Sequence, residues 1–244
     1  MTYCVGLKLD RGIVFASDTR TNAGFDNIAT YKKMNVWESK GERVLVLLTA
    51  GNLAVTQAVV SILNEQIDAA SAGDQLTLMT VPTMFQAARL VGEALKDVRK
   101  TDGEALGLSS DAFAATFILG GQIKGERPRL FQIYNEGNFI EATDDTPYIQ
   151  TGEHKYGKPI LDRVVVSPMR LGEAAKLVLL SFDSTLRSNL SVGLPIDLLI
   201  YRTDTFEVGE QQRIEEDDPY FRKLSAAWSE ALRDAFKHLD EYGE

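Results

Sequence analysis

The order in which strands and helices follow one another is the feature that most constrains this chain's fold. Apolar residues at every second position predict strands, and apolar residues at every third or fourth position predict helices. The predicted strands occupy residues 3–9, 13–17, 35–38, 44–50, 112–119, 129–134, 139–142, 148–151 and 196–202. The predicted helices occupy residues 53–70, 81–100, 158–165, 171–187 and 221–242. Because strands and helices come in groups, the order predicts an α+β fold of antiparallel sheets covered by layers of helices.

Turn residues separate the predicted elements. Asp10-Arg11-Gly12 predicts a tight turn that joins the first two strands into a hairpin. Residues 21–30 predict a polar loop. Because no repeat or Pro/Gly-rich linker divides the sequence, we expect a single domain over residues 1–244. Its core spans about residues 2–203, and a C-terminal helical extension spans about residues 204–244.

Charge and hydropathy exclude several classes of partner. The net charge of -9 argues against non-specific binding to nucleic acid or to an anionic membrane. No stretch reaches the roughly 18 unbroken apolar residues that a membrane span requires. Lys8, Asp10 and Arg11 also interrupt any signal peptide at the N-terminus. We therefore expect a cytoplasmic protein that binds neither nucleic acid nor membrane.

The scarcity of cysteine and histidine limits the available chemistry. Cys4, the single cysteine, excludes an intramolecular disulfide framework, and its place in the first strand predicts a small buried residue. The two histidines, His154 and His238, have no metal-ligand companions at helical spacing. We therefore expect no metal and no cofactor, and a histidine-dependent catalytic triad is disfavoured.

A near match to a phosphate-binding loop runs from Gly152 to Pro159. The phosphate-loop pattern places Ser or Thr directly after its lysine, where the hydroxyl holds magnesium. Here Pro159 follows Lys158 and has no hydroxyl, and Glu153 would bring a negative charge among the phosphates. The segment therefore does not predict nucleotide binding.

Thr2 offers a nucleophile that needs no histidine. A small second residue generally permits removal of Met1, which would leave the Thr2 hydroxyl and a free α-amine on one residue. The α-amine has an ordinary pKa of about 7.7–8.0, so it can act as a general base near neutral pH. Threonine at position 2 is common, however, and the interpretation depends on residues elsewhere.

Four landmarks follow Thr2 in order along the chain. They are the turn at Gly12, Ser17-Asp18-Thr19-Arg20, Lys32-Lys33-Met34 and Thr49-Ala50-Gly51. Together they resemble the proteasome β-type family, which includes the proteasome β-subunits and bacterial HslV, and the resemblance extends to about Tyr201. Within this group the chain is most similar to the Anbu (ancestral β subunit) family, because of its Thr2-Tyr3-Cys4-Val5-Gly6 start, the absence of a propeptide beyond Met1 and its long acidic C-terminal extension.

The resemblance implies a fold and a catalytic set. The fold is a four-layer αββα sandwich typical of N-terminal nucleophile hydrolases, in which two antiparallel sheets are flanked by helices. Thr2 would attack a peptide carbonyl, with its own α-amine as the base. Lys33 would favour the deprotonated forms of Thr2, Asp18 would hold Lys33 charged and oriented, and the Gly51 backbone N–H would bind the oxyanion.

The resemblance also implies supporting and substrate-binding residues. Arg20 would be a structural partner in the same charge cluster, and Thr151-Gly152 corresponds to a Ser-Gly pair of the family. Ser191 is retained from the family's Arg-Asp-x-x-Ser segment, but Ser188 replaces its aspartate, so weak or assembly-dependent activity is expected. The residues expected to bind substrate are Thr21, Asn22, Ala23, Thr49 and Leu53.

The resemblance therefore predicts a peptidase that acts on peptides or unfolded proteins. It would work in a ring-like or helical homo-oligomer, and an unfoldase partner is possible. Two alternatives stay open: a small-amide amidohydrolase of the same superfamily, and a weak or inactive scaffold subunit. The apolar residues of the C-terminal helix are compatible with packing on the chain's own core or against another subunit.

Overall fold

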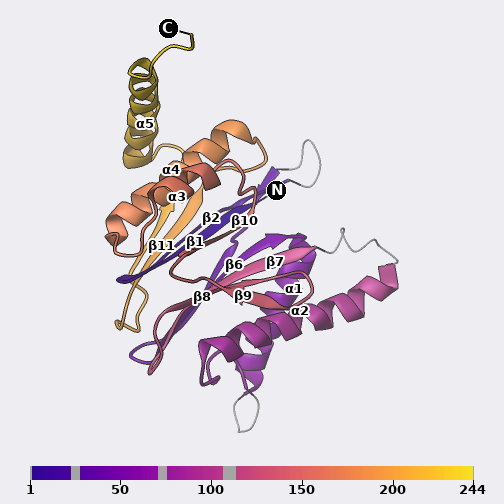
Figure 1. Cartoon of the computed structure of the whole chain (residues 1–244). Coiled ribbons are helices and arrows are strands. Elements are labelled where there is room, and N and C mark those ends of the chain that lie inside the picture. Colours follow the sequence, from indigo (N-terminus) through magenta and orange to yellow (C-terminus); the bar gives the residue numbers. More distant parts are fainter. Residues whose placement is uncertain (1, 23–27, 71–75, 107–113, 244) are drawn as a thin grey trace.

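The computed structural model describes residues 2–22, 28–70, 76–106 and 114–243. Two five-stranded antiparallel sheets lie between two layers of helices (Figure 1). The first sheet contains, in order, β10 (Tyr148–Gly152), β1 (Tyr3–Leu9), β2 (Gly12–Asp18), β11 (Ile196–Arg202) and β12 (Glu210–Ile214). The second contains β5 (Met34–Ser39), β6 (Arg43–Gly51), β7 (Ala115–Ile123), β8 (Arg129–Ile133) and β9 (Phe139–Glu141).

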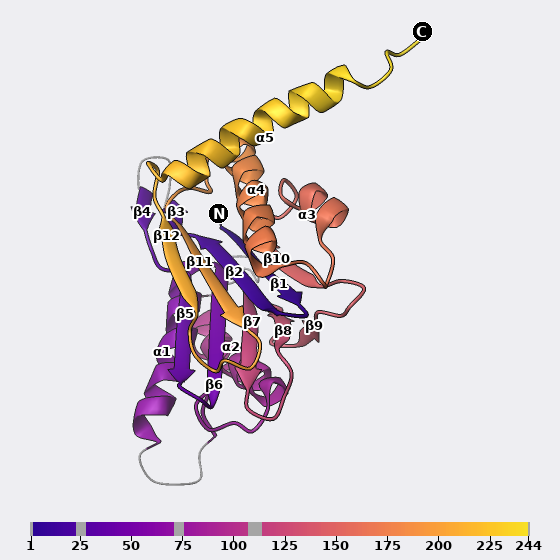
Figure 2. The same cartoon turned by 90° about the vertical axis from the view of Figure 1, so that its left-hand side faces the viewer.

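Helices cover the outer face of each sheet. Helices α3 (Lys158–Val164) and α4 (Leu171–Ser188) lie on the first sheet, and α1 (Leu53–Ala69) and α2 (Met84–Leu106) lie on the second (Figure 2). The order helix, sheet, sheet, helix confirms the predicted α+β sandwich. No described helix is both long and apolar enough to cross a membrane.

Residues of the central strands alternate between two apolar cores. Along β2, Val14 and Ala16 pack toward α4, whereas Ile13 and Phe15 pack between the two sheets. Successive side chains of a strand point to opposite faces, so a strand buried on both sides is apolar throughout. A one-residue slip of such a strand would exchange its two sets of side chains, which is why the core determines the register.

The register of the first sheet places functional candidates beside one another. Cys4 of β1 pairs with Ser17 of β2 and with Thr151 of β10. Thr2 immediately precedes β1, and Asp18 is the last residue of β2. The N-terminus and the end of β2 therefore meet at the same edge of the sandwich.

Two predicted segments differ from the structure because polar edge strands lack the apolar pattern that predicts a strand. The expected polar loop at residues 21–30 contains a short ribbon of β3 (Arg20–Asn22) and β4 (Ile28–Thr30). Residues 210–214, expected in the helical extension, form β12 at the edge of the first sheet. β12 has Ile214 as its only apolar residue, and pairing with β11 supplies its backbone partners.

The ends of two helices also differ from prediction. Helix α2 begins at Met84 and not at residue 81, because Pro82 precedes Thr83, whose hydroxyl accepts a hydrogen bond from the Gln86 amide at 3.2 Å. Helix α5 (Pro219–Lys237) begins after Asp218, which accepts from the Phe221 amide at 2.8 Å. It ends five residues before the predicted end at residue 242.

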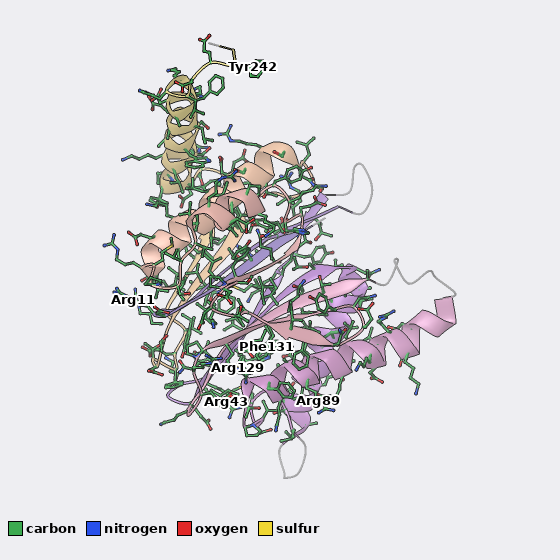
Figure 3. All side chains as sticks on the ribbon, viewed as in Figure 1. Arg11, Arg43, Arg89, Arg129, Phe131 and Tyr242 are labelled. Carbon is green, nitrogen blue, oxygen red and sulfur yellow. The ribbon has the colours of Figure 1, made fainter. Side chains whose placement is uncertain are left out.

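Helix α5 leaves the body of the molecule. Phe221, in its first turn, is buried against α4, but the helix then runs away from the sandwich in both views (Figures 1 and 2). Tyr242 lies beyond its far end, with no part of the sandwich nearby (Figure 3). The apolar residues in the second half of the helix therefore do not pack on the chain's own core.

Candidate active site

The backbone of Thr2 is held by the end of β10. The Thr2 carbonyl accepts a hydrogen bond from the Glu153 amide at 2.7 Å, and Gly152 pairs with Tyr3. Gly152 has a φ of +80°, and a Cβ at this position would lie 1.9 Å from the Thr2 carbonyl oxygen. Only glycine allows this close approach, so Gly152 positions the backbone of Thr2.

Asp18 and Lys33 form a buried ion pair beside Thr2. Lys33 Nζ lies 2.8 Å from Asp18 Oδ1, and the same oxygen accepts from the Tyr3 amide at 3.0 Å. Lys33 Nζ also donates to the Arg20 carbonyl oxygen at 2.6 Å. Because the pair is buried, removal of either partner would leave an uncompensated charge in the interior.

The surroundings of Asp18 shift the pKa of its carboxyl group in opposite directions. Burial raises the pKa of Asp18, whereas the Lys33 ammonium and the Tyr3 amide lower it. Burial has the larger effect, so the pKa lies above the ordinary aspartate value.

A pocket of about 310 Å³ brings the predicted residues together. Thr2 is 8% exposed and opens onto this pocket. The pocket is lined by Thr2, Thr21, Lys33, Thr49, Ala50, Gly51, Asn52, Leu53, Ala54 and Thr56. Asp18 is not among the lining residues and lies behind Lys33, which separates the anion from the pocket.

Gly51 forms the junction between β6 and α1 at the edge of the pocket. Its φ is +111°, and a Cβ here would lie 2.2 Å from the Ala114 carbonyl oxygen. Asn52 then caps α1 by accepting from the Val55 amide at 3.2 Å. The first turn of α1 therefore meets the pocket with its partly positive N-terminus, where a developing negative charge is stabilised.

Sequence analysis missed part of the lining from this same turn. Asn52, Ala54 and Thr56 line the pocket, although only Leu53 of this segment was predicted. The N-cap pattern at Asn52 and the spacing of four residues to Thr56 were the available signals.

The predicted supporting residues fall into two groups. Gly152 and Thr151 pair with Tyr3 and Cys4, the two residues that follow Thr2, and Thr151 Oγ1 lies 2.5 Å from Thr116 Oγ1. Ser188 is exposed at the end of α4, and Ser191 donates to Asn189 Oδ1 at 2.5 Å. Neither serine is part of the pocket lining, and a supporting role for either one stays a prediction.

Arg20 contacts the charge cluster through its backbone. Its carbonyl oxygen accepts a hydrogen bond from Lys33 Nζ at 2.6 Å. Its guanidinium donates to the Leu190 carbonyl oxygen at 3.0 Å, in the loop after α4. Among the described residues, no carboxylate lies within ion-pair distance of this guanidinium.

Two predicted substrate-binding residues lack a described side chain. Asn22 belongs to β3, but only its backbone is described. Ala23 lies outside the described residues, as does Met1. Thr21, Thr49 and Leu53 all line the pocket with Thr2.

Three further features singled out in the sequence have surroundings that the structure describes. Cys4 is fully buried, and burial raises the pKa of its thiol. Lys158 of the phosphate-loop-like segment is paired with Asp162 at 2.9 Å. Across the described part of the chain, no group of three or more His, Cys, Asp or Glu residues could hold a metal ion.

The fold and the pocket define the class of this protein. The family model described as proteasome subunit matches residues 2–200, and the chain belongs to this family of N-terminal nucleophile hydrolases. Among solved structures, a Gly-1 mutant of Anbu from Hyphomicrobium sp. strain MC1 is 64% identical, with a TM-score of 0.94 and complete coverage of both chains. Within the proteasome-type family, the chain is therefore a member of the Anbu group.

Two further Anbu structures support this assignment. The Anbu (ancestral beta-subunit) structure from Yersinia bercovieri is 48% identical, with a TM-score of 0.93 and 99% of each chain covered. A structure described as the helical assembly of the Anbu complex from Pseudomonas aeruginosa is 46% identical, with a TM-score of 0.91. It covers 98% of this chain and 97% of its own. No curated protein sequence matches the chain.

Proposed function

We propose that this chain is an N-terminal threonine peptidase that hydrolyses peptide bonds within a homo-oligomer. The observation that carries the proposal is the shared pocket of Thr2, Lys33 and Gly51, with Asp18 paired behind Lys33 at 2.8 Å. A nucleophile, a fixed cation and a backbone donor are the parts that acyl transfer requires.

The first half of the reaction forms an ester on Thr2. With Met1 removed, the Thr2 α-amine accepts the hydroxyl proton while Oγ1 attacks the carbonyl carbon of the substrate. The Gly51 amide and the N-terminus of α1 stabilise the resulting oxyanion. Collapse breaks the C–N bond, and the α-ammonium returns the proton to the departing amine.

The second half of the reaction releases the acyl group. The α-amine removes a proton from a water molecule that attacks the ester carbonyl, and the Thr2 hydroxyl leaves with that proton. Asp18 holds the Lys33 ammonium in place through their ion pair at 2.8 Å. Its positive charge favours the deprotonated states of the Thr2 amine and hydroxyl.

Self-association is part of the proposal. The Pseudomonas aeruginosa relative is described as a helical assembly, and its match covers 98% of this chain. Helix α5 supplies an apolar surface that the sandwich does not cover, with Phe236 77% exposed. We therefore infer a homo-oligomer that acts on peptides or unfolded proteins in the cytoplasm.

A catalytically silent scaffold is the second candidate function. It is favoured by Ser188, which stands where the family's motif has an aspartate and is exposed at the end of α4. Without that carboxylate, the support for the nucleophile would be weaker. The two functions differ in whether Thr2 reacts.

Variants at Thr2 and Lys33 test the proposal. Thr2→Ala removes the nucleophile and should lower kcat for a fluorogenic peptide by about 10³-fold or more, whereas Thr2→Ser should retain activity. Lys33→Met should also abolish turnover, and Lys40→Met, on the exposed turn between β5 and β6, serves as its matched control. Circular dichroism identifies any variant that fails to fold. Turnover by folded Thr2→Ala equal to that of the parent would exclude the threonine peptidase.

A further inference from the structure

A second pocket adjoins the one that contains Thr2. It has a volume of about 320 Å³ and shares Thr49, Leu53 and Thr56 with the first pocket. Its remaining lining residues are Lys32, Asn35, Gln57, Val60 and Ser61. Because three residues belong to both linings, a peptide bound at Thr2 has this second pocket beside it.

The lining of the second pocket is polar and carries a positive charge. Lys32 contributes an ammonium, and the other polar residues contribute hydroxyl and amide groups. Leu53 and Val60 add a small apolar surface for the methylene groups of a long side chain. Among the described residues, neither this lining nor that of the first pocket includes Asp or Glu.

This absence of carboxylates distinguishes the two adjoining pockets. The chain has 35 acidic and 26 basic residues, so its surface is predominantly acidic. Pockets elsewhere on the described chain do contain carboxylates, with Glu215 and Glu216 in one and Glu141 in another. The region beside Thr2 is therefore a local exception to the charge of the molecule.

The two adjacent lysines have different environments. Lys33 is buried and paired with Asp18 at 2.8 Å. Lys32 is exposed at the second pocket, and no carboxylate of the described chain lies within ion-pair distance of its ammonium. The charge of Lys32 is thus available to a bound molecule, whereas the charge of Lys33 is used within the protein.

We propose that the second pocket binds an acidic side chain of the substrate and that Lys32 selects it. The side chain concerned would be that of the residue whose carbonyl Thr2 attacks, because that carbonyl must enter the first pocket, which shares Thr49, Leu53 and Thr56 with the second. A glutamate would place its carboxylate by the Lys32 ammonium and its methylene groups against Leu53 and Val60. This inference rests on the proposed function, since it assumes that a peptide binds at Thr2.

A matched pair of peptides isolates the effect of charge. Two fluorogenic peptides would differ only in carrying Glu or Gln before the scissile bond, so size and shape are nearly equal. A single pairing with an exposed lysine contributes up to about 1 kcal/mol, so kcat/KM should favour Glu by about fivefold. Lys32→Met should bring this ratio to about one, and Lys32→Glu should invert it. Lys40→Met and Lys40→Glu make the same charge changes away from the pocket and should leave the ratio unchanged.

A binding measurement separates this inference from the proposed function. Fluorescence anisotropy with the full-length Thr2→Ala protein compares the affinity of labelled Glu and Gln peptides without any turnover. About fivefold tighter binding of the Glu peptide, lost in Thr2→Ala/Lys32→Met, would support the inference even if the parent cleaves neither peptide. Equal affinity for the two peptides, or a Glu preference that survives Lys32→Met, would overturn it while leaving a cleaving enzyme intact.

Discussion

At the scale of single residues, the Asp18–Lys33 pair makes the proposed activity sensitive to acid. Burial raises the pKa of Asp18 above the ordinary aspartate value of about 3.9. Acidification first protonates the Thr2 α-amine, whose ordinary pKa is about 7.7–8.0, and this lowers kcat/KM near neutral pH. Protonation of Asp18 then removes the charge that orients Lys33, so we expect a second fall in kcat/KM while exposed aspartates are still ionised. A pH profile of peptide cleavage measures the midpoint of this fall.

The same shift has the opposite effect on folding stability. An acid whose pKa is raised by folding binds its proton more tightly in the folded state. Its contribution to the free energy of unfolding is therefore present below the ordinary pKa and is lost as pH rises through the raised value.

Asp144→Asn, which removes an exposed carboxylate, is the control for the activity profile and should leave both falls in kcat/KM unchanged. A second fall centred at or below the ordinary aspartate pKa would contradict the assignment to Asp18.

At the scale of structural elements, the end of β10 determines where the start of β1 lies. Gly152→Ala adds a Cβ in a left-handed conformation and against the Thr2 carbonyl oxygen. The backbone conformation alone costs about 1–2 kcal/mol, and displacement of Thr2 should also lower kcat. Gly41→Ala is the matched control, because Gly41 has a φ of +77° and no heavy atom within 4 Å of its added Cβ.

Urea denaturation and peptide turnover measure the two effects of these glycine variants. We expect both variants to be destabilised, Gly152→Ala by more than Gly41→Ala. Only Gly152→Ala should lose turnover. Full activity in a folded Gly152→Ala protein would show that the close contact with Thr2 has no role in positioning it.

The elements that could be predicted from the sequence are those whose residues are buried along nearly their whole length. The strands of residues 3–9 and 196–202 are buried on both faces or nearly so, and their apolar runs predicted their bounds without error. β12 and β3 could not be predicted, because an edge strand with solvent on one side needs few apolar residues. Their pairing with the neighbouring strands β11 and β4, and not their composition, makes them strands.

In the candidate site too, short motifs predicted some residues, whereas the positions of others depend on how the elements pack. Thr2, Lys33 and Gly51 could be proposed together because each belongs to a short motif in the order of the family. The place of Thr56 in the pocket depends on the phase of α1 relative to β6, which the sequence alone does not determine. Ser191 is the serine expected at its place in the family's motif, but its hydroxyl donates a hydrogen bond to Asn189. The residue type alone did not predict this hydrogen bond.

At the scale of the whole molecule, α5 is a candidate for contact between copies. Leu232 and Phe236 are 51% and 77% exposed on this helix, which extends away from the sandwich (Figure 3), and Leu239, just beyond its end, is 71% exposed. Replacing all three by Ser should shift the protein to smaller species in sedimentation velocity, because the burial of these side chains between copies would be lost. The far-ultraviolet circular dichroism should not change. Val164→Ser/Val166→Ser, at exposed apolar residues elsewhere, is the control. An unchanged oligomer in the α5 variant would place the interface elsewhere.

The most direct test of the whole account is the chemical state and reactivity of Thr2 in the assembled protein. Intact and N-terminal peptide mass spectrometry would be applied before and after treatment with an electrophilic peptide inhibitor. The account predicts a chain that begins at Thr2, one inhibitor adduct on that residue, and no adduct in the Thr2→Ala protein. A retained Met1, or an adduct that persists in Thr2→Ala, would contradict an N-terminal threonine nucleophile.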